Sequence, residues 1–152
     1  MTDQYRVPDS SARVAQAALN LFAISSVAYA ASTYLSIKIA DAIRAGTTPM
    51  LPAQTADMMT ATVSLIFVIC NVASIVLTAI WIYRSNKYAH LLSSEIKTGP
   101  VMALVWYAVP ILNLSRPLLT MREVWRVSHS PDAPSSVRMP ALMPLWWFCW
   151  LM

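Results

Sequence analysis

Charged side chains are scarce in this chain of 152 residues: only 12% are Asp, Glu, Lys or Arg, whereas soluble domains carry about 25%. With 57% hydrophobic residues, the composition also excludes a disordered polypeptide, which requires low hydrophobicity and high charge. Two cysteines exclude a disulfide scaffold, and two histidines leave few ligands for a metal site. Two glycines exclude the glycine-rich loops that bind nucleotide phosphates. We therefore expect no cofactor and no metal centre.

Two long stretches contain no charged residue at all. They comprise residues 14–37 and 58–83, and each exceeds the ~20 apolar residues that cross ~30 Å of hydrocarbon. Neither shows the polar stripe of a helix that covers a soluble core. The sequence therefore predicts two transmembrane helices, preceded by a short leader at residues 1–13 that lies outside the membrane.

Two shorter apolar stretches follow, over residues 98–115 and 139–152. As helices they would reach roughly 27 Å and 21 Å, so the first barely spans and the second does not. Pro110 should kink the first, and we expect the natural protein to continue beyond the second. The prediction is an all-α, polytopic transmembrane bundle in one domain over residues 14–152, with three to four spans, the last one incomplete.

Between these two stretches, residues 117–127 are expected to form an amphipathic helix at the membrane interface. Leu118, Met121, Val124 and Trp125 share one arc, and Arg122, Glu123 and Arg126 share another. Arg116, Arg122 and Arg126 could bind the phosphates of anionic lipid, and plain solvation of these charges is an equally good interpretation. We expect Glu123 to pair with Arg126 or Arg116 rather than to act as a base.

The basic residues bear on the orientation of the protein in its membrane. If every stretch crosses, five basic side chains lie on one side and six on the other, so the positive-inside rule decides nothing. If residues 98–115 instead turn back at Pro110, the division becomes nine against two. We favour full crossing, because a non-helical turn at membrane depth must be buried in protein, and the orientation stays open.

Polar and small residues inside the spans predict contacts between helices. Asn20 and Asn71 are amides within the first two stretches, and such groups usually hydrogen-bond between helices. Ala28, Ser32 and Ser36 form a ridge of small residues suited to a close neighbour, which is either the second helix or another protein.

Several spaced motifs occupy the second half of the chain. They comprise Trp81, Tyr83, Arg84 and Asn86, then Pro110, Asn113, Arg116 and Pro117, then Met121, Glu123 and Trp125, and finally Trp146 and Trp147. In this order they resemble the domain-of-unknown-function 4328 family of small bacterial multi-pass membrane proteins, over roughly residues 15–152. The resemblance implies a four-helix domain in the bacterial cytoplasmic membrane, and it supplies no reaction.

Each motif has a structural interpretation and a binding interpretation. The aromatic and basic residues around Trp81 are expected to form an interfacial belt, with a head-group site as the alternative. Asn86 and Asn113 are expected to cap exposed backbone groups, with ligand binding as the alternative.

The missing chemistry narrows the function further. The first three stretches contain no ionisable Asp, Glu, Lys, Arg or His, which disfavours proton-coupled transporters and pumps. No catalytic constellation is recognisable. We therefore expect a non-catalytic accessory or scaffold subunit that contacts lipid and other integral membrane proteins, and no nucleic acid. The alternative is a homo-oligomeric channel, transporter or lipid-binding protein that uses Asn71 and Pro110, and an enzyme working through Glu123 is the least favoured.

Overall fold

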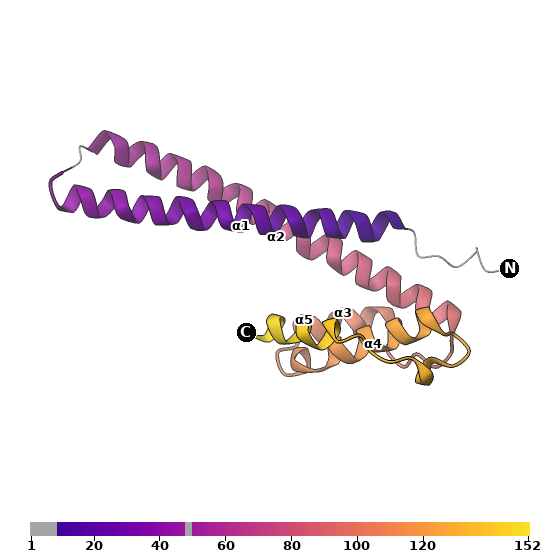
Figure 1. Cartoon of the computed structure of the whole chain (residues 1–152). Coiled ribbons are helices and arrows are strands. Elements are labelled where there is room, and N and C mark those ends of the chain that lie inside the picture. Colours follow the sequence, from indigo (N-terminus) through magenta and orange to yellow (C-terminus); the bar gives the residue numbers. More distant parts are fainter. Residues whose placement is uncertain (1–8, 48–49) are drawn as a thin grey trace. The chain divides into compact units, whose positions relative to one another are not determined.

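The structure, a computed structural model, describes residues 9–47 and 50–152 (Figure 1). Its elements are α1 (Asp9–Arg44), α2 (Met50–Leu92), α3 (Pro100–Ala108), the short 3-10 turn η1 (Leu112–Leu114), α4 (Arg116–His129), a second 3-10 turn η2 (Pro134–Ser136) and α5 (Leu142–Leu151). The described residues contain helices and no strand, which confirms the all-α prediction. Residues 12–78 form one compact unit, and residues 79–152 with residues 9–11 form the other.

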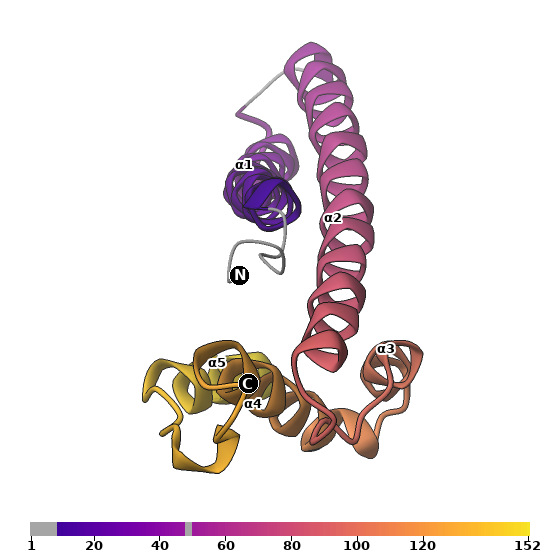
Figure 2. The same cartoon turned by 90° about the vertical axis from the view of Figure 1, so that its right-hand side faces the viewer.

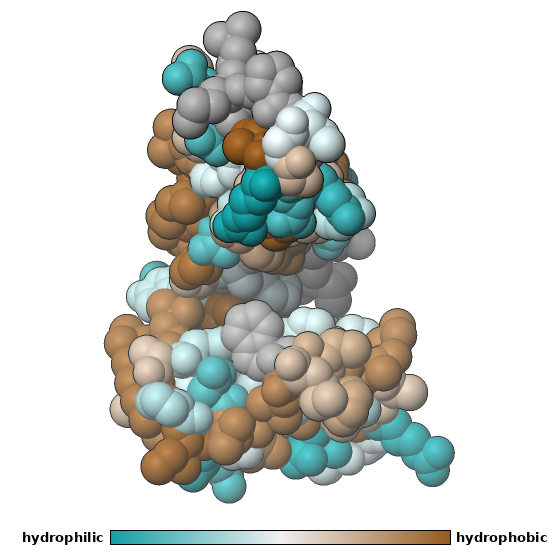
Figure 3. All heavy atoms as spheres, turned by 90° about the vertical axis from the view of Figure 1, so that its left-hand side faces the viewer, coloured by the Kyte–Doolittle hydropathy of each residue, from teal (hydrophilic) through white to brown (hydrophobic). Residues whose placement is uncertain are grey.

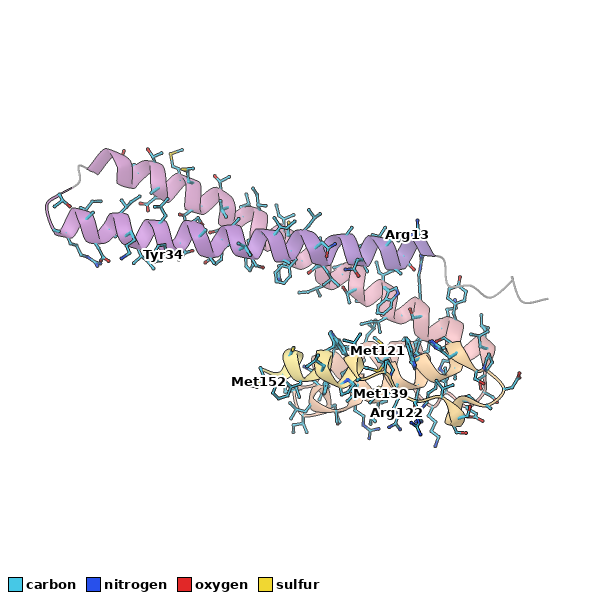
Figure 4. All side chains as sticks on the ribbon, in the orientation of Figure 1. Arg13, Tyr34, Met121, Arg122, Met139 and Met152 are labelled. Atoms are coloured by element: carbon cyan, nitrogen blue, oxygen red, sulfur yellow. The ribbon has the colours of Figure 1, made fainter. Side chains whose placement is uncertain are left out.

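The helices α1 and α2 contain the two predicted spans and extend beyond them at both ends. The segments Ser10–Arg44 and Gln54–Leu92 are long and apolar enough to cross a membrane, with mean hydropathies of 1.4 and 2.5. Only 17% and 11% of their most apolar windows are buried within the chain, whereas the core helix of a soluble fold is mostly buried. In Figure 4 their side chains project outward along both ribbons, Tyr34 among them.

The end of α1 is set by its glycine. Gly46 has φ of +72°, a left-handed conformation that favours glycine. Its N–H donates to the carbonyl of Ile43 at 2.9 Å, and the N–H of Thr47 donates to the carbonyl of Ala42 at 3.0 Å. This pair of bonds is a Schellman motif, which satisfies the last carbonyls of the helix and stops it there.

Aromatic rings join α1 to α2 within residues 12–78. Phe67 of α2 lies 4.9 Å from the ring of Tyr29, in a stacked arrangement, and 5.7 Å from the ring of Phe22. Figure 1 shows the two helices running antiparallel. One aromatic side chain of α2 thus contacts two residues of α1 that lie two turns apart.

Two of the three small residues predicted to form a ridge on α1, Ser32 and Ser36, contact α2. The hydroxyls of Ser36 and Thr60 are 2.6 Å apart, and the Thr60 hydroxyl donates to the carbonyl of Ser32 at 3.5 Å. Ala28 is exposed. Asn20 accepts a hydrogen bond from Gln16 at 3.3 Å on the same helix, so the prediction that it joins two helices is wrong.

Residues 98–115 do not form one helix, and the predicted third span is wrong in this respect. The helix α3 ends at Ala108, and Val109 is extended with φ of −94° and ψ of 112°. Proline disfavours the helical conformation of the residue before it, so Pro110 ends the helix instead of kinking it. The nine residues of α3 rise roughly 14 Å, less than half of the hydrocarbon thickness.

After this turn the chain folds back along α3. Ser115 is the N-cap residue of α4, its side chain makes no capping hydrogen bond, and Pro117 lies in the first turn. The amphipathic helix expected over residues 117–127 lies within α4, and α3 and α4 are in contact. The helix α5 has ten residues and starts three residues later than the stretch 139–152. Figure 1 shows α3 and α5 running opposite to α4 and to the last turns of α2.

Candidate functional site

The last turns of α2 bury one helical face, part of which contacts α4. Ile82, Ser85, Asn86 and Ala89 are all buried, and their spacing of three and four residues places them on one side of the helix. Ala89 forms an apolar cluster with Ile96 and Val127, against which Leu92 and Val124 pack. The cluster fixes which face of α2 meets which face of α4.

Asn86 is the most unusual residue of this face. It is 0% exposed, and neither its amide nitrogen nor its amide oxygen has a hydrogen-bond partner within the part of the chain that the structure describes. The helix continues six residues beyond it to Leu92. Asn86 therefore caps no helix end, and the capping prediction is wrong for it.

Two further buried polar atoms lie in the same unit. Oε2 of Glu123 on α4 and Oδ1 of Asn113 in η1 have no hydrogen-bond partner among residues 9–47 and 50–152. Glu123 stands between the buried residues Thr120 and Val127 on the inner face of α4. We call Asn86, Asn113 and Glu123 the polar core.

The arginines expected to pair with Glu123 have other contacts. The Arg116 guanidinium lies 5.2 Å from the ring centre of Trp106, a cation–π contact. Nε of Arg126 donates to the carbonyl of Val137 at 3.2 Å, which fastens the loop after α4. Within the described residues neither arginine forms an ion pair with Glu123, so that prediction is wrong.

Figures 1 and 2 show α4 and the last turns of α2 ending at the same end of this unit. Asn86 stands one turn before Ala89, and Glu123 stands one turn before Val127. Asn113 precedes α4 altogether. Each unpartnered polar group of this kind destabilises a fold by about 1–3 kcal/mol, so the three residues of the polar core are each left unsatisfied by the described part of the chain.

A family model described as "Domain of unknown function (DUF4328)" matches residues 44–152. The match covers well over half of the chain and includes every member of the polar core. The chain belongs to the DUF4328 family. No curated protein and no solved structure matches the chain.

The match confirms the predicted family membership, and it begins at Arg44, so all of α1 before that residue lies outside it. Of its motif residues, Pro117 and Trp147 are buried, and Met121, Glu123 and Trp125 are half-buried. Tyr83 and Arg84 are exposed, and nothing in the structure tests the aromatic belt. One contact was not foreseen: Nε2 of His90 lies 2.8 Å from the carbonyl of Thr98 and holds the loop after α2. Only the three-dimensional fold brings these two residues together.

Groups suited to acid–base or metal chemistry are sparse in the DUF4328 region. Among the residues that the structure describes, no group of three or more His, Cys, Asp or Glu could hold a metal ion. Desolvation raises the pKa of the Tyr107 phenol to about 12, so Tyr107 is uncharged at neutral pH. The buried polar groups of the polar core are two amides and one carboxylate, those of Asn86, Asn113 and Glu123.

Trp147 attaches α5 to the rest of the DUF4328 region. Its side chain is buried, and its indole N–H donates to the carbonyl of Leu114 at 3.2 Å. Trp146 is exposed, and its ring centre lies 5.5 Å from that of Trp147. The two tryptophans of the motif thus have different structural roles.

We expect Trp147→Phe to lower the free energy of unfolding by about 0.5–1.5 kcal/mol, the net value of one hydrogen bond. Chemical unfolding of the purified full chain in mild detergent measures this loss. Trp146→Phe is the matched control, because it keeps an aromatic ring and removes an indole that donates no hydrogen bond in the described structure. Equal losses for the two variants would contradict the role given to the bond.

Proposed function

We propose that this protein is a non-catalytic integral membrane protein, an accessory or scaffold subunit of a larger assembly in the bacterial cytoplasmic membrane. It acts by packing its helices against other membrane proteins and against lipid. The observation that carries this proposal is the outward apolar surface of α1 and α2.

That surface is too extensive for a helix pair in water. Val27 on α1 is 72% exposed and Ile75 on α2 is 61% exposed, and large apolar side chains are exposed along both helices. Figure 3 shows broad brown, hydrophobic areas on the face that it presents, separated by smaller teal patches. Soluble monomers rarely expose contiguous apolar patches beyond a few hundred Å². Lipid and other membrane helices are the surroundings that favour such a surface.

The distribution of charge supports a packing role over transport. Residues 14–37 and 58–83 contain no ionisable Asp, Glu, Lys, Arg or His, whereas pumps and proton-coupled transporters place such groups within their spans. The one carboxylate of the polar core, Glu123, lies outside both candidate spans. An assembly subunit needs no such group, because close packing and a few hydrogen bonds join helices in lipid.

The test is native mass spectrometry of the tagged full chain, extracted from its own membrane in mild detergent. We expect a stoichiometric complex with at least one other integral membrane protein. A lone monomer would overturn the proposal. A homo-oligomer without a second protein would also overturn it, and would favour the channel or lipid-binding alternative.

A further inference from the structure

We propose that α3 and α4 insert together into the cytoplasmic leaflet without crossing the membrane, with α5 packed against α4, and that the basic side of α4 binds the phosphates of anionic phospholipid. We call these three helices, with η1 and η2, the leaflet module. The inference rests on the proposed membrane location of α1 and α2. It adds the orientation of the protein in its membrane and the chemical class of lipid that it binds.

The lengths of α3 and α4 exclude a crossing by either of them. The two helices have 9 and 14 residues, which correspond to roughly 14 and 21 Å against ~30 Å of hydrocarbon. The turn that Pro110 imposes returns the chain along α3, and η1 contacts both α3 and α4. Hydrogen bonds within the turn satisfy part of its backbone, because the N–H groups of Asn113 and Ser115 donate to the carbonyls of Val109 and Leu112 at 2.8 and 3.2 Å.

The leaflet module nevertheless has an apolar surface that needs a cover. Ile111 is 79% exposed and Leu142 is 74% exposed. The other large apolar side chains that α3, η1 and α5 leave exposed are Val101, Met102, Val105, Leu114, Leu145, Trp146, Phe148 and Leu151. The helix α2, apolar enough to cross the membrane, runs directly into this unit. We therefore infer that the hydrocarbon of the adjoining leaflet covers these exposed apolar side chains.

Charge selects the cytoplasmic leaflet. If the leaflet module does not cross, nine basic residues share the side of the amino terminus: Arg6, Arg13, Arg84, Lys87, Lys97, Arg116, Arg122, Arg126 and Arg138. Only Lys38 and Arg44 remain on the other side. Cytoplasmic segments of membrane proteins carry the excess of Lys and Arg, and anionic lipid attracts such clusters. The turn at Pro110 thus resolves the orientation that the sequence left open.

Arg122 is the arginine of α4 that is free to bind lipid. Arg116 lies over Trp106, and Arg126 donates to Val137. Arg122 is half-buried, with no hydrogen bond or ion pair to another described residue. In Figure 4 it leaves α4 in a different direction from its neighbour Met121. A guanidinium held at an apolar surface matches phosphate with two parallel N–H donors.

Cysteine labelling of the full chain in its own membrane tests the topology. In a background with Cys70→Ala and Cys149→Ala, single cysteines replace the exposed residues Thr47, Ser94 and Ser135. A membrane-impermeant maleimide should label Thr47→Cys in spheroplasts, and should label the other two only after permeabilisation.

Labelling of Ser94→Cys and Ser135→Cys from opposite sides would overturn the proposal, because α3 would then cross. Labelling of both from outside would overturn the orientation. Carbonate extraction of the same membranes tests the membrane location separately. Release of the protein into the supernatant would refute the proposed function, whereas a retained protein with the wrong labelling pattern refutes the leaflet module alone.

Lipid binding is tested with the purified full chain in mixed micelles that contain either phosphatidylglycerol or phosphatidylcholine. We expect tighter binding of phosphatidylglycerol, and about a fivefold loss in Arg122→Gln, which corresponds to one cation near an anionic surface. Arg44→Gln is the control, because it also removes one arginine. Arg44 lies in the last turn of α1, outside the leaflet module, and its guanidinium is 3.2 Å from the carboxylate of Asp41. Equal binding of the two lipids, or an equal loss in the control, would overturn the assignment.

Discussion

Replacement of Leu65 and Ile69 by arginine in one chain is expected to prevent stable integration of α2 into the membrane. Both side chains are exposed, and they lie near the middle of the uncharged residues 58–83. Four residues apart, they share one face of the helix. An arginine at the centre of a span costs about 2.5–3.5 kcal/mol. Two such costs together amount to roughly four to five powers of ten in the equilibrium between inserted and non-inserted states.

The fraction of full-length protein that resists carbonate extraction measures this effect. We expect it to fall to background in the double arginine variant, together with the amount of protein in the cell. Leu65→Ala with Ile69→Ala is the matched control, because it shortens the same side chains without adding charge and should remain in the membrane. A double arginine variant that accumulates, folded and soluble, would show that this face of α2 lies in water.

The existence of α1 and α2 could be predicted because it depends on a sum over many residues. A run of more than twenty uncharged, mainly apolar residues forms a helix whatever its neighbours are. The boundaries were less predictable: α1 continues to Arg44 and α2 to Leu92, beyond the uncharged runs that end at residues 37 and 83. Charged residues end a membrane span and not a helix, so the helix continues until a local signal such as Gly46 stops it.

The region after α2 depended on local backbone effects and on tertiary contacts. The absence of charge over residues 98–115 suggested one membrane span. The extended conformation of Val109, before Pro110, instead ends the helix α3 at Ala108. The motifs include Asn86, Asn113 and Glu123, which the structure shows with buried polar atoms that lack a partner among the described residues. Asn86 does not cap a helix because α2 continues through it, and Glu123 does not pair with an arginine because it lies on the inner face of α4. Periodicity identifies the buried faces of α2 and α4, but only the fold shows that these two faces contact each other.

The polar core gives the last prediction, because an unpartnered buried amide has a cost that substitution can remove. Asn86→Leu keeps the volume of the side chain and eliminates two polar atoms that have no partner in the described structure. We expect it to raise the free energy of unfolding of the purified chain by about 1–3 kcal/mol. Chemical unfolding in detergent measures the change. Asn20→Leu is the control, because Asn20 is exposed and its oxygen already accepts a bond from Gln16, and its effect should stay within about 0.5 kcal/mol.

The sign of the Asn86→Leu effect distinguishes an empty polar core from a filled one. A loss of stability in the purified chain would contradict the unpartnered state, since it would mean that Asn86 is hydrogen-bonded there. A gain in detergent combined with loss of the native complex would show that a partner, absent after purification, satisfies the amide in the membrane. An unpaired buried polar group costs more free energy than a formed hydrogen bond gains. An assembly that supplied a hydrogen-bond partner to Asn86 would therefore gain more binding free energy from this residue than from an apolar contact of the same area.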